Sequence, residues 1–199
     1  MNVLVACEFS GAVRDAFAAL GHDATSCDLL ATEAPGKHHH GDVFDLDLST
    51  FDLMIAHPPC THLAVSGARW WPAKRAEQAE AVAFVKRLLA APVKRIALEN
   101  PIGLLSTVIR PADQIIQPWE HGHGETKATC LWLKGLPPLL PSNVVAGRVA
   151  RTHLEPPGPD RWARRSRTLP GIAAAMAAQW GAAEHWRPAQ GSLFDLLAM

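Results

Sequence analysis

The sequence predicts an α/β protein built on a Rossmann-like, doubly wound sheet. Short apolar runs, typical of strands buried on both faces, occur at residues 2–7, 24–27, 53–56 and 93–98. Segments with apolar residues at helical spacing separate several of them. The chain has 199 residues and is 48% hydrophobic, which suits one domain with a single large core. Such alternation of strands and helices is the pattern of a parallel sheet with helices on both faces.

The first third of the chain reads as a strand, a helix and a second strand. Residues 2–7 lead to a turn at Gly11, and residues 12–20 have the apolar spacing of an amphipathic helix. Gly21 stops that helix, and the second strand ends at Asp28. We therefore expect a β-α-β unit at the start of the sheet.

The remaining chain becomes less regular toward its end. Prolines crowd residues 137–159 and the hydrophobic period weakens after residue 100, so this half is expected to be rich in loops. The helix at 72–91 is expected to open at its proline. The further elements that we expect are strands at 53–56, 93–98 and 128–133, and helices at 72–91 and 170–180.

The composition favours a soluble, cytoplasmic protein. The apolar run at 172–178 is far shorter than the roughly 20 residues of a membrane span, and the first residues lack the basic region and cleavage site of a secretion signal. The four cysteines have neither a C-x-x-C pair nor compact disulfide spacing, which is typical of free thiols in a reducing compartment. We expect residues 1–187 to form one domain and residues 188–199 to form a tail.

Charge is distributed unevenly although the formal net charge is zero. Residues 1–60 contain nine acids and two bases, whereas residues 142–170 contain six arginines and two acids. Such a chain suits a cationic cofactor near one end and a polyanion near the other. Ordinary scatter of surface charge is the alternative interpretation.

Residues that follow the predicted strands carry the chemistry of a candidate site. In open α/β sheets, ligands bind at the carboxyl ends of the strands. A glycine turn follows the first strand, and an acid follows about 17 residues later. This pattern fits a bound nucleoside whose ribose hydroxyls donate hydrogen bonds to the acid. The residues at these ends are Glu8 to Gly11, Asp28, Gly41 and Asp42, His57 to Cys60, and Glu99 and Asn100.

The glycine turn favours a cofactor without phosphates. No second and third glycine follow Gly11, so a pyrophosphate cradle is not expected. S-adenosylmethionine needs only the turn, an acid for the ribose and a polar group for adenine. The acidic first third of the chain also suits its positive charges.

Cys60 is the strongest candidate for a catalytic residue. Most cysteines are buried and structural, which fits Cys7, Cys27 and Cys130. Cys60 instead follows two prolines at a strand end, with Glu99 expected at the neighbouring strand end. We therefore predict that Cys60 is a nucleophile and that Glu99 belongs to the same site.

The ordered motifs resemble those of the C5-cytosine DNA methyltransferases, in a small, phage-type form. The resemblance implies the Rossmann-like sheet of methyltransferases that use S-adenosylmethionine. It implies that residues 1–101 form the cofactor and catalytic half, about 102–165 a reduced, loop-rich target-recognition region, and 166–181 a returning helix. The motifs that carry it are Phe9-Ser10-Gly11, Asp28, Gly41-Asp42-Val43, Pro58-Pro59-Cys60 and Glu99-Asn100-Pro101.

The resemblance also implies a mechanism and a set of site residues. Cys60 would add to C6 of a flipped or single-stranded cytosine, and Glu99 would hold the N3 edge and share its proton. Pro59 would help fix the loop, and Asn100 would brace it. The implied cofactor-binding residues are Phe9, Ser10, Gly11, Asp28, Asp42 and Pro58.

Two departures from the family pattern concern the handling of the target strand. Thr61 stands where the family usually has glutamine, and His57 stands where a small residue is usual. The downstream Gln-x-Arg-x-Arg motif is absent as such, and its nearest counterpart is at 124–129. The candidates for contacts with the base or with DNA are Thr61, Lys127, Thr129, Arg164, Arg165 and Arg167.

Several side chains have more than one interpretation. Trp70 and Trp71 are expected either to stack on a base or to pack on the core. His121 and His123 lie in a turn that could also contact phosphate. The histidines at 38–40 with Asp42, and His57 with Cys60 and His62, lack a complete zinc-ligand spacing, so we predict no metal site.

Two other functional classes remain open on the sequence. One is a methyltransferase-fold protein that acts on another pyrimidine target, in RNA or as a nucleotide. The other is a dormant module that binds DNA or the bacterial replication sliding clamp. The tail residues Gln190, Leu193 and Phe194 resemble the short peptide by which DNA-processing enzymes bind that clamp, although the tail could instead pack on its own domain.

Overall fold

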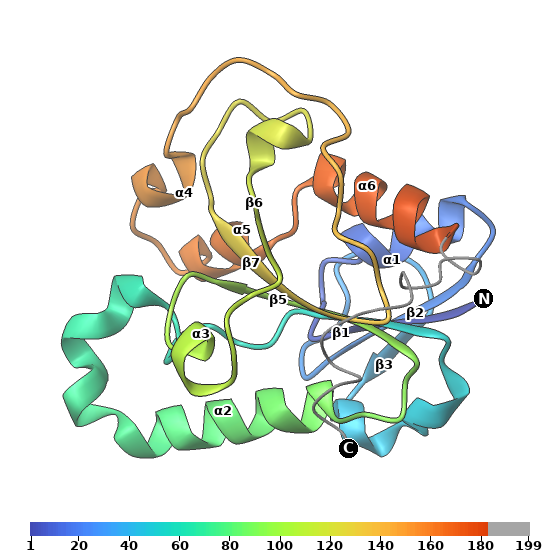
Figure 1. The fold of residues 1–199 in the computed structure, drawn as a ribbon, viewed down its shortest axis with the longest axis horizontal. Helices are drawn as coiled ribbons and strands as arrows, with labels where there is room; N and C mark the ends of the chain where they lie inside the picture. Colours follow the sequence, from blue (N-terminus) through green and yellow to red (C-terminus); the bar gives the residue numbers. More distant parts are fainter. Residues whose placement is uncertain (183–199) are drawn as a thin grey trace, which may run out of the picture.

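The computed structural model describes residues 1–182, which form an α/β fold around one seven-stranded sheet (Figure 1). The tail residues that resemble a clamp-binding peptide, Gln190, Leu193 and Phe194, lie outside the described residues. The strands, in the spatial order β3-β2-β1-β4-β5-β7-β6, are β1 (Asn2–Ala6), β2 (Asp23–Asp28), β3 (His38–His40), β4 (Leu53–Ala56), β5 (Arg95–Pro101), β6 (Gln114–Ile116) and β7 (Thr129–Lys134).

The sheet is mixed, with a parallel part and an antiparallel edge. Strands β3, β2, β1, β4 and β5 are parallel, as the alternation of strands and helices predicts. Strand β7 runs antiparallel to both β5 and β6. From β5 the chain passes through α3 to β6 at the edge of the sheet, and it then returns along β7, which lies between β5 and β6. The doubly wound prediction therefore holds for five strands and not for the last two.

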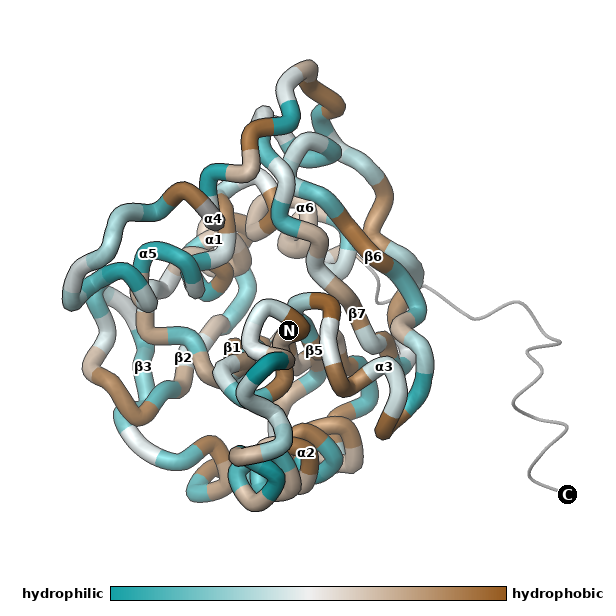
Figure 2. Tube along the Cα trace, turned by 90° about the vertical axis from the view of Figure 1, so that its left-hand side faces the viewer, coloured by the Kyte–Doolittle hydropathy of each residue, from teal (hydrophilic) through white to brown (hydrophobic). Residues whose placement is uncertain are grey.

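Helices cover both faces of the sheet. Helices α1 and α6 lie on one face and α2 lies on the other, as Figure 2 shows from the end of the molecule. Short 3-10 helices η1 to η4 occupy connections between these elements. The helices are α1 (Ala12–Ala19), α2 (Arg75–Leu89), α3 (Leu105–Val108), α4 (Arg151–Leu154), α5 (Arg161–Ser166) and α6 (Pro170–Gly181), and the 3-10 helices are η1 (Val43–Asp45), η2 (Leu48–Thr50), η3 (Val65–Ala73) and η4 (Pro118–Glu120).

The core divides into two layers because side chains alternate along each strand. In β1, Val3 and Val5 pack with residues of α1 and α6, whereas Leu4 and Ala6 pack on the side of α2. Both layers are fully buried at this strand. The continuous apolar runs in the sequence follow from this arrangement, since both faces of the central strands are covered.

One expected helix begins later than the sequence suggests. We expected a helix at 72–91 that opens at its proline, but α2 begins at Arg75 and Pro72 lies inside η3. Lys74 separates the two with φ −124° and ψ 31°, which is not helical backbone. The final helix, Pro170–Gly181, does begin at its proline, as expected. None of the helices in residues 1–182 is long and apolar enough to cross a membrane.

Candidate active site

The register of two parallel strands places His57 beside Glu99. Ala56 of β4 pairs with Leu98 of β5, so the next residue of each strand lies at the same level of the sheet. Nδ1 of His57 lies 2.6 Å from Oε2 of Glu99. Only 11% of the His57 side chain and 16% of the Glu99 side chain are exposed. We expected His57 at this strand end but gave it no catalytic or binding role, and the signal that could have found its pairing with Glu99 is the shared register.

Each partner favours the charged form of the other. Burial alone would lower the pKa of His57, but the hydrogen bond and charge of Glu99, together with the charge of Glu8, raise it above its ordinary value. Burial alone would raise the pKa of Glu99, but the hydrogen bond and charge of His57, with the charge of Lys127, lower it. These opposite pKa shifts favour an ion pair between an imidazolium and a carboxylate.

The loop that carries Cys60 is held by Asn100. Nδ2 of Asn100 donates a 2.9 Å hydrogen bond to the carbonyl oxygen of Pro58, and the Asn100 side chain is 1% exposed. The backbone amides of Leu63 and Ala64 donate to the carbonyl oxygen of Cys60, which closes a turn after the cysteine. The bracing contact that we expected from Asn100 is thus present.

The Cys60 thiol lies between opposing charges. Burial, and then the charge of Glu99, raise the pKa of the Cys60 thiol, whereas Lys127 and Arg165 act to lower it. The charge of Lys127 also lowers the pKa of Glu99, so this lysine lies near both predicted catalytic groups. The loop after β4 and the segment before β7 therefore meet near Cys60, and the expected contact of Lys127 with the base stays a prediction.

The other predicted base-holding residues are placed differently. Thr129 is buried at the start of β7, and its hydroxyl donates a 3.0 Å hydrogen bond to the carbonyl oxygen of Lys127. Its role in the structure is therefore to support Lys127. Thr61 is exposed, immediately after Cys60.

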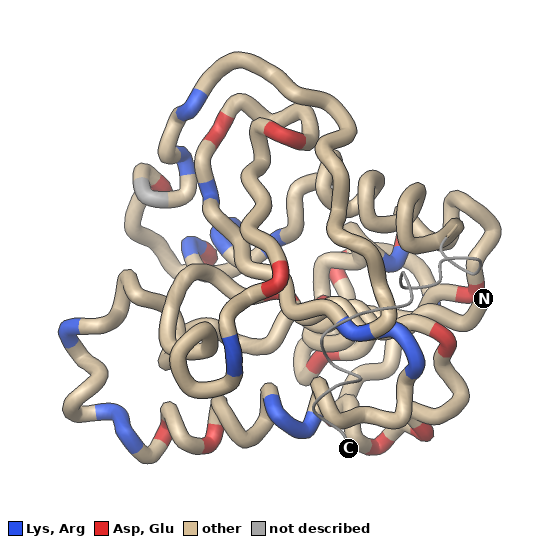
Figure 3. The backbone as a smooth tube through the Cα atoms, viewed as in Figure 1, with Lys and Arg blue, Asp and Glu red and all other residues tan. Residues whose placement is uncertain are grey.

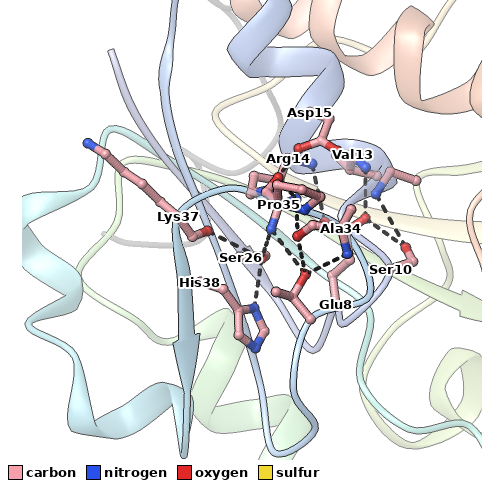
Figure 4. A network of polar contacts seen from close by, with 12 residues as sticks. Glu8, Ser10, Val13, Arg14, Asp15, Ser26, Ala34, Pro35, Lys37 and His38 are labelled. Atoms are coloured by element: carbon pink, nitrogen blue, oxygen red, sulfur yellow. Dashed lines mark hydrogen bonds and ion pairs between the residues drawn. The ribbon is translucent and has the colours of Figure 1, made fainter.

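A buried carboxylate occupies the N-terminus of α1 (Figure 4). Glu8 is 4% exposed, and its carboxylate accepts hydrogen bonds from the backbone amides of Val13 and Arg14, at 2.7 Å and 3.2 Å. Ser10 joins it, because its hydroxyl donates to Glu8 at 3.4 Å and accepts from the amide of Ala12 at 3.3 Å. The amides that would bind a phosphate at this helix are thus already paired with a negative charge.

Arg14 fixes the segment that follows β2. Its guanidinium is 1% exposed and donates to the hydroxyls of Ser26 and Thr32, and to the carbonyl oxygens of Ala34 and Pro35, at 2.9 to 3.2 Å (Figure 4). This contact set holds the segment against the turn that precedes α1. Helical spacing alone does not reveal it, since an arginine on a short helix is usually exposed.

Arg14 also explains the glycine of the first turn. Gly11 has φ +77°, in the left-handed region, and a Cβ at this position would collide with Nη2 of Arg14. The backbone conformation and the packing of Arg14 are therefore enough to explain why glycine occupies this position. The expected contact between Gly11 and a cofactor stays a prediction.

The remaining predicted cofactor residues surround the carboxyl ends of β1, β2 and β3. Asp28 accepts from the amide of Leu30 at 2.9 Å, and the exposed Asp42 accepts from the amide of Phe44 at 3.0 Å. The rings of Phe9 and Trp162 lie 5.5 Å apart between centroids. Trp162 is 55% exposed, so this aromatic pair is open to solvent at its outer side.

The predicted arginines differ in what they contact. Arg164 pairs with Glu155 at 2.7 Å, and Arg167 pairs with Glu33 at 2.6 Å. The charge of Arg165 acts to lower the pKa of the Cys60 thiol. The buried Nε of Arg165 has no hydrogen-bond partner within residues 1–182. Figure 3 shows that basic residues lie on both sides of this end of the sheet, along η3 and the start of α2 and along residues 148–167.

In the described part of the chain, no three His, Cys, Asp or Glu side chains are grouped as they would be around a metal ion. A cavity of about 390 Å³ lies between α1 and the start of β2, and Arg14, His22 and Lys37 are among the residues that line it. None of the predicted site residues lines this cavity, which lies toward the opposite end of the strands.

The comparisons with known proteins add no family. No family model matches the sequence, and no curated protein is significantly similar to it. The case for a function therefore depends on the motifs and on the geometry of the site.

Proposed function

We propose that the protein transfers a methyl group from S-adenosylmethionine to C5 of cytosine in DNA, through a covalent adduct with Cys60. The observation that carries this proposal is the position of Cys60. It stands on a loop braced by Asn100, next to the buried pair of His57 and Glu99 at the ends of two adjacent strands. A nucleophile beside a buried carboxylate is what addition to a pyrimidine requires.

The topology of the sheet supports a nucleoside cofactor. From β1 the chain proceeds to β2 and β3 on one side and then to β4 and β5 on the other, so the order reverses between β1 and β4. Ligands of open α/β sheets bind in the crevice outside such a switch point. The predicted cofactor residues lie mainly at the ends of β1, β2 and β3, and the predicted catalytic residues lie at the ends of β4 and β5.

The charges at these ends favour S-adenosylmethionine over a dinucleotide. Glu8 already occupies the N-terminus of α1, so a pyrophosphate would face a buried carboxylate there. S-adenosylmethionine carries no phosphate and bears a sulfonium and an ammonium group, which acids attract. We assign the ribose and adenine contacts to the carboxylates of Asp28 and Asp42. When bound, the cofactor supplies the methyl group.

The chain's own residues can perform the activation of the base. The Cys60 thiolate attacks C6, and the displaced electron pair makes C5 nucleophilic. We assign to Glu99 the role of holding N3 and controlling the proton there. After methyl transfer, loss of the C5 proton restores the double bond and releases Cys60.

Lys127 and Arg165 support the formation of the thiolate. Burial raises the pKa of Cys60, so the thiol needs nearby cations to lose its proton at neutral pH. Both residues lower that pKa, and Lys127 is also the residue that we predicted to replace the family's base-holding arginine. We propose that Lys127 serves both purposes.

The distribution of arginines favours a polymer as the substrate. Six arginines between residues 148 and 167 lie on one side of the candidate site, and basic residues of η3 and α2 lie on the other. Phosphate contacts from both sides would position a strand across Cys60. A free nucleotide would need far fewer cations.

A methylation assay with product identification tests this function. The full chain is incubated with S-adenosylmethionine labelled in its methyl group and with DNA in single-stranded or duplex form, or with RNA of the same sequence. The nucleosides are then separated by mass spectrometry. We expect 5-methylcytosine in DNA. Label only in RNA would move the substrate to another class, and the absence of label in every substrate would overturn the proposal.

A further inference from the structure

One ring nitrogen of His57 has a hydrogen-bond partner, and the other is buried without one in the described residues. Nδ1 lies 2.6 Å from Glu99, whereas Nε2 is buried and has no hydrogen-bond partner in residues 1–182. Leaving a buried polar atom unpaired costs stability, so such an atom calls for an explanation. Within residues 1–182, the hydrogen bond that anchors the His57 ring is therefore the one to Glu99.

The charges that face His57 come from three elements. Glu99 at the end of β5 and Glu8 after β1 both favour the protonated ring, and Lys127 before β7 opposes it. The two carboxylates prevail, so the pKa of His57 is raised. His57 is therefore more readily protonated than a free imidazole, and it lies within hydrogen-bond distance of the carboxylate that is proposed to hold cytosine.

We propose that His57 stores the proton that Glu99 delivers to N3 of the target cytosine and takes the same proton back when the product leaves. His57 thus acts through Glu99 and does not touch the base. This inference rests on the proposed methyl transfer, and it assigns a role to the residue that stands where the resembling family usually has a small side chain.

For the addition of Cys60 to C6, the proton and electron balance closes with the groups of the site alone. The sulfur pair of Cys60 forms the bond to C6, the C5–C6 π pair moves to C4–C5, and the C4–N3 π pair takes a proton at N3. The Nδ1 proton of His57 passes to the Glu99 carboxylate across the 2.6 Å contact, and Glu99 passes a proton on to N3. The imidazolium becomes neutral as the thiolate charge is consumed, so the total charge of the site is unchanged. After methyl transfer, the N3 proton returns by the same route.

The test uses a variant that keeps the hydrogen bond and removes the proton store. His57→Asn places an amide N–H near the position of Nδ1, so it can still donate to Glu99 but cannot ionise. His22→Asn, at the amino end of β2, is the matched control at the other end of the strands. The measurement is the rate of a single turnover of methyl transfer to cytosine in DNA, followed as a function of pH.

Wild-type protein should give a rate that rises with pH as Cys60 ionises and then levels off above the pKa of His57, because the stored proton is lost there. The single-turnover rate of His57→Asn should be about 100-fold lower at low pH, and it should continue to rise with pH without levelling off. His22→Asn should keep the wild-type profile. An unchanged rate and bend in His57→Asn would overturn the inference while leaving methyl transfer intact. No turnover in wild type would instead overturn the proposed function.

Discussion

Asn100 ties the end of β5 to the loop that carries Cys60, since its Nδ2 donates to the carbonyl oxygen of Pro58 at 2.9 Å. This one contact connects the strand that presents Glu99 to the loop that presents the nucleophile. The relative position of the two groups depends on it, because the loop itself contains two prolines that cannot donate hydrogen bonds.

Asn100→Ala should loosen this connection. The substitution leaves a buried carbonyl without its donor, which should lower the free energy of unfolding by about 1–3 kcal/mol. Asn2→Ala is the control, because Asn2 is exposed and its amide donates to Thr50 at 3.3 Å; it should cost no more than about 0.5 kcal/mol. Urea denaturation of both variants measures the difference. Equal losses would show that Asn100 does not brace the loop.

Gly11→Ala should cost more than Gly21→Ala. Both glycines have φ near the same positive value, +77° and +82°. An alanine in this left-handed backbone should lower the free energy of unfolding by about 1–2 kcal/mol in either variant. Only at Gly11 does the added Cβ meet a side chain, the guanidinium of Arg14, while nothing lies within 4 Å of it at Gly21. Urea denaturation should therefore separate the variants. Similar losses would mean that Arg14 moves aside freely.

Lys127→Met should reduce the reactivity of Cys60. Without the lysine charge the pKa of the Cys60 thiol rises further, so less thiolate is present at neutral pH. Each unit of increase lowers the rate of alkylation at about pH 7 tenfold. The rate is measured with iodoacetamide, by mass spectrometry of the Cys60 peptide. Lys37→Met, which removes an exposed lysine paired with Asp23, should leave the rate unchanged, and a similar loss there would refute a local effect.

The pair of His57 and Glu99 should stabilise the fold in a defined pH range. The raised pKa of His57 gives stability that is complete below the ordinary value of 6.5 and is lost as pH rises through the raised value. The lowered pKa of Glu99 gives stability that is complete above 4.5 and is lost as pH falls through the lowered value. The contribution of the pair is therefore largest between these two ordinary values.

His57→Ala should accordingly be most destabilising in that range, by about 3–5 kcal/mol, because it leaves Glu99 buried without its partner. The loss should shrink as pH rises above the pKa of His57. Arg167→Ala, which breaks an exposed pair, should cost less than about 1 kcal/mol at every pH. Urea denaturation across pH measures both. A loss that grows toward alkaline pH in His57→Ala would contradict the ion pair.

The strand ends could be predicted because both faces of the central strands are buried. Continuous apolar runs marked the strands, and the polar residues directly after them had to lie at one edge of the sheet. This reasoning placed Cys60 and Glu99 together. The register between these two strands was not available from the sequence, so the pairing of His57 with Glu99 was missed, although it follows directly from the pairing of Ala56 with Leu98.

Other features left no readable pattern in the sequence. Strand β6 has three residues, too few for a periodic signal, and β7 could not be assigned a direction from its own residues. Glu8 looks like an ordinary loop acid, yet its carboxylate is buried at the N-terminus of α1. Arg14 looks like a surface residue of a helix, and only the folded segment after β2 surrounds it.

The most direct test of the proposed chemistry is the capture of a covalent adduct. Protein is incubated with S-adenosylmethionine and DNA that contains 5-fluorocytosine, from which the C5 substituent cannot leave as a proton. Wild-type protein should become linked to DNA through Cys60. Cys60→Ser should form no adduct, while Cys130→Ser, a change at a buried cysteine of β7, should form it as wild type does. An adduct in Cys60→Ser, or none in the wild type, would contradict the account.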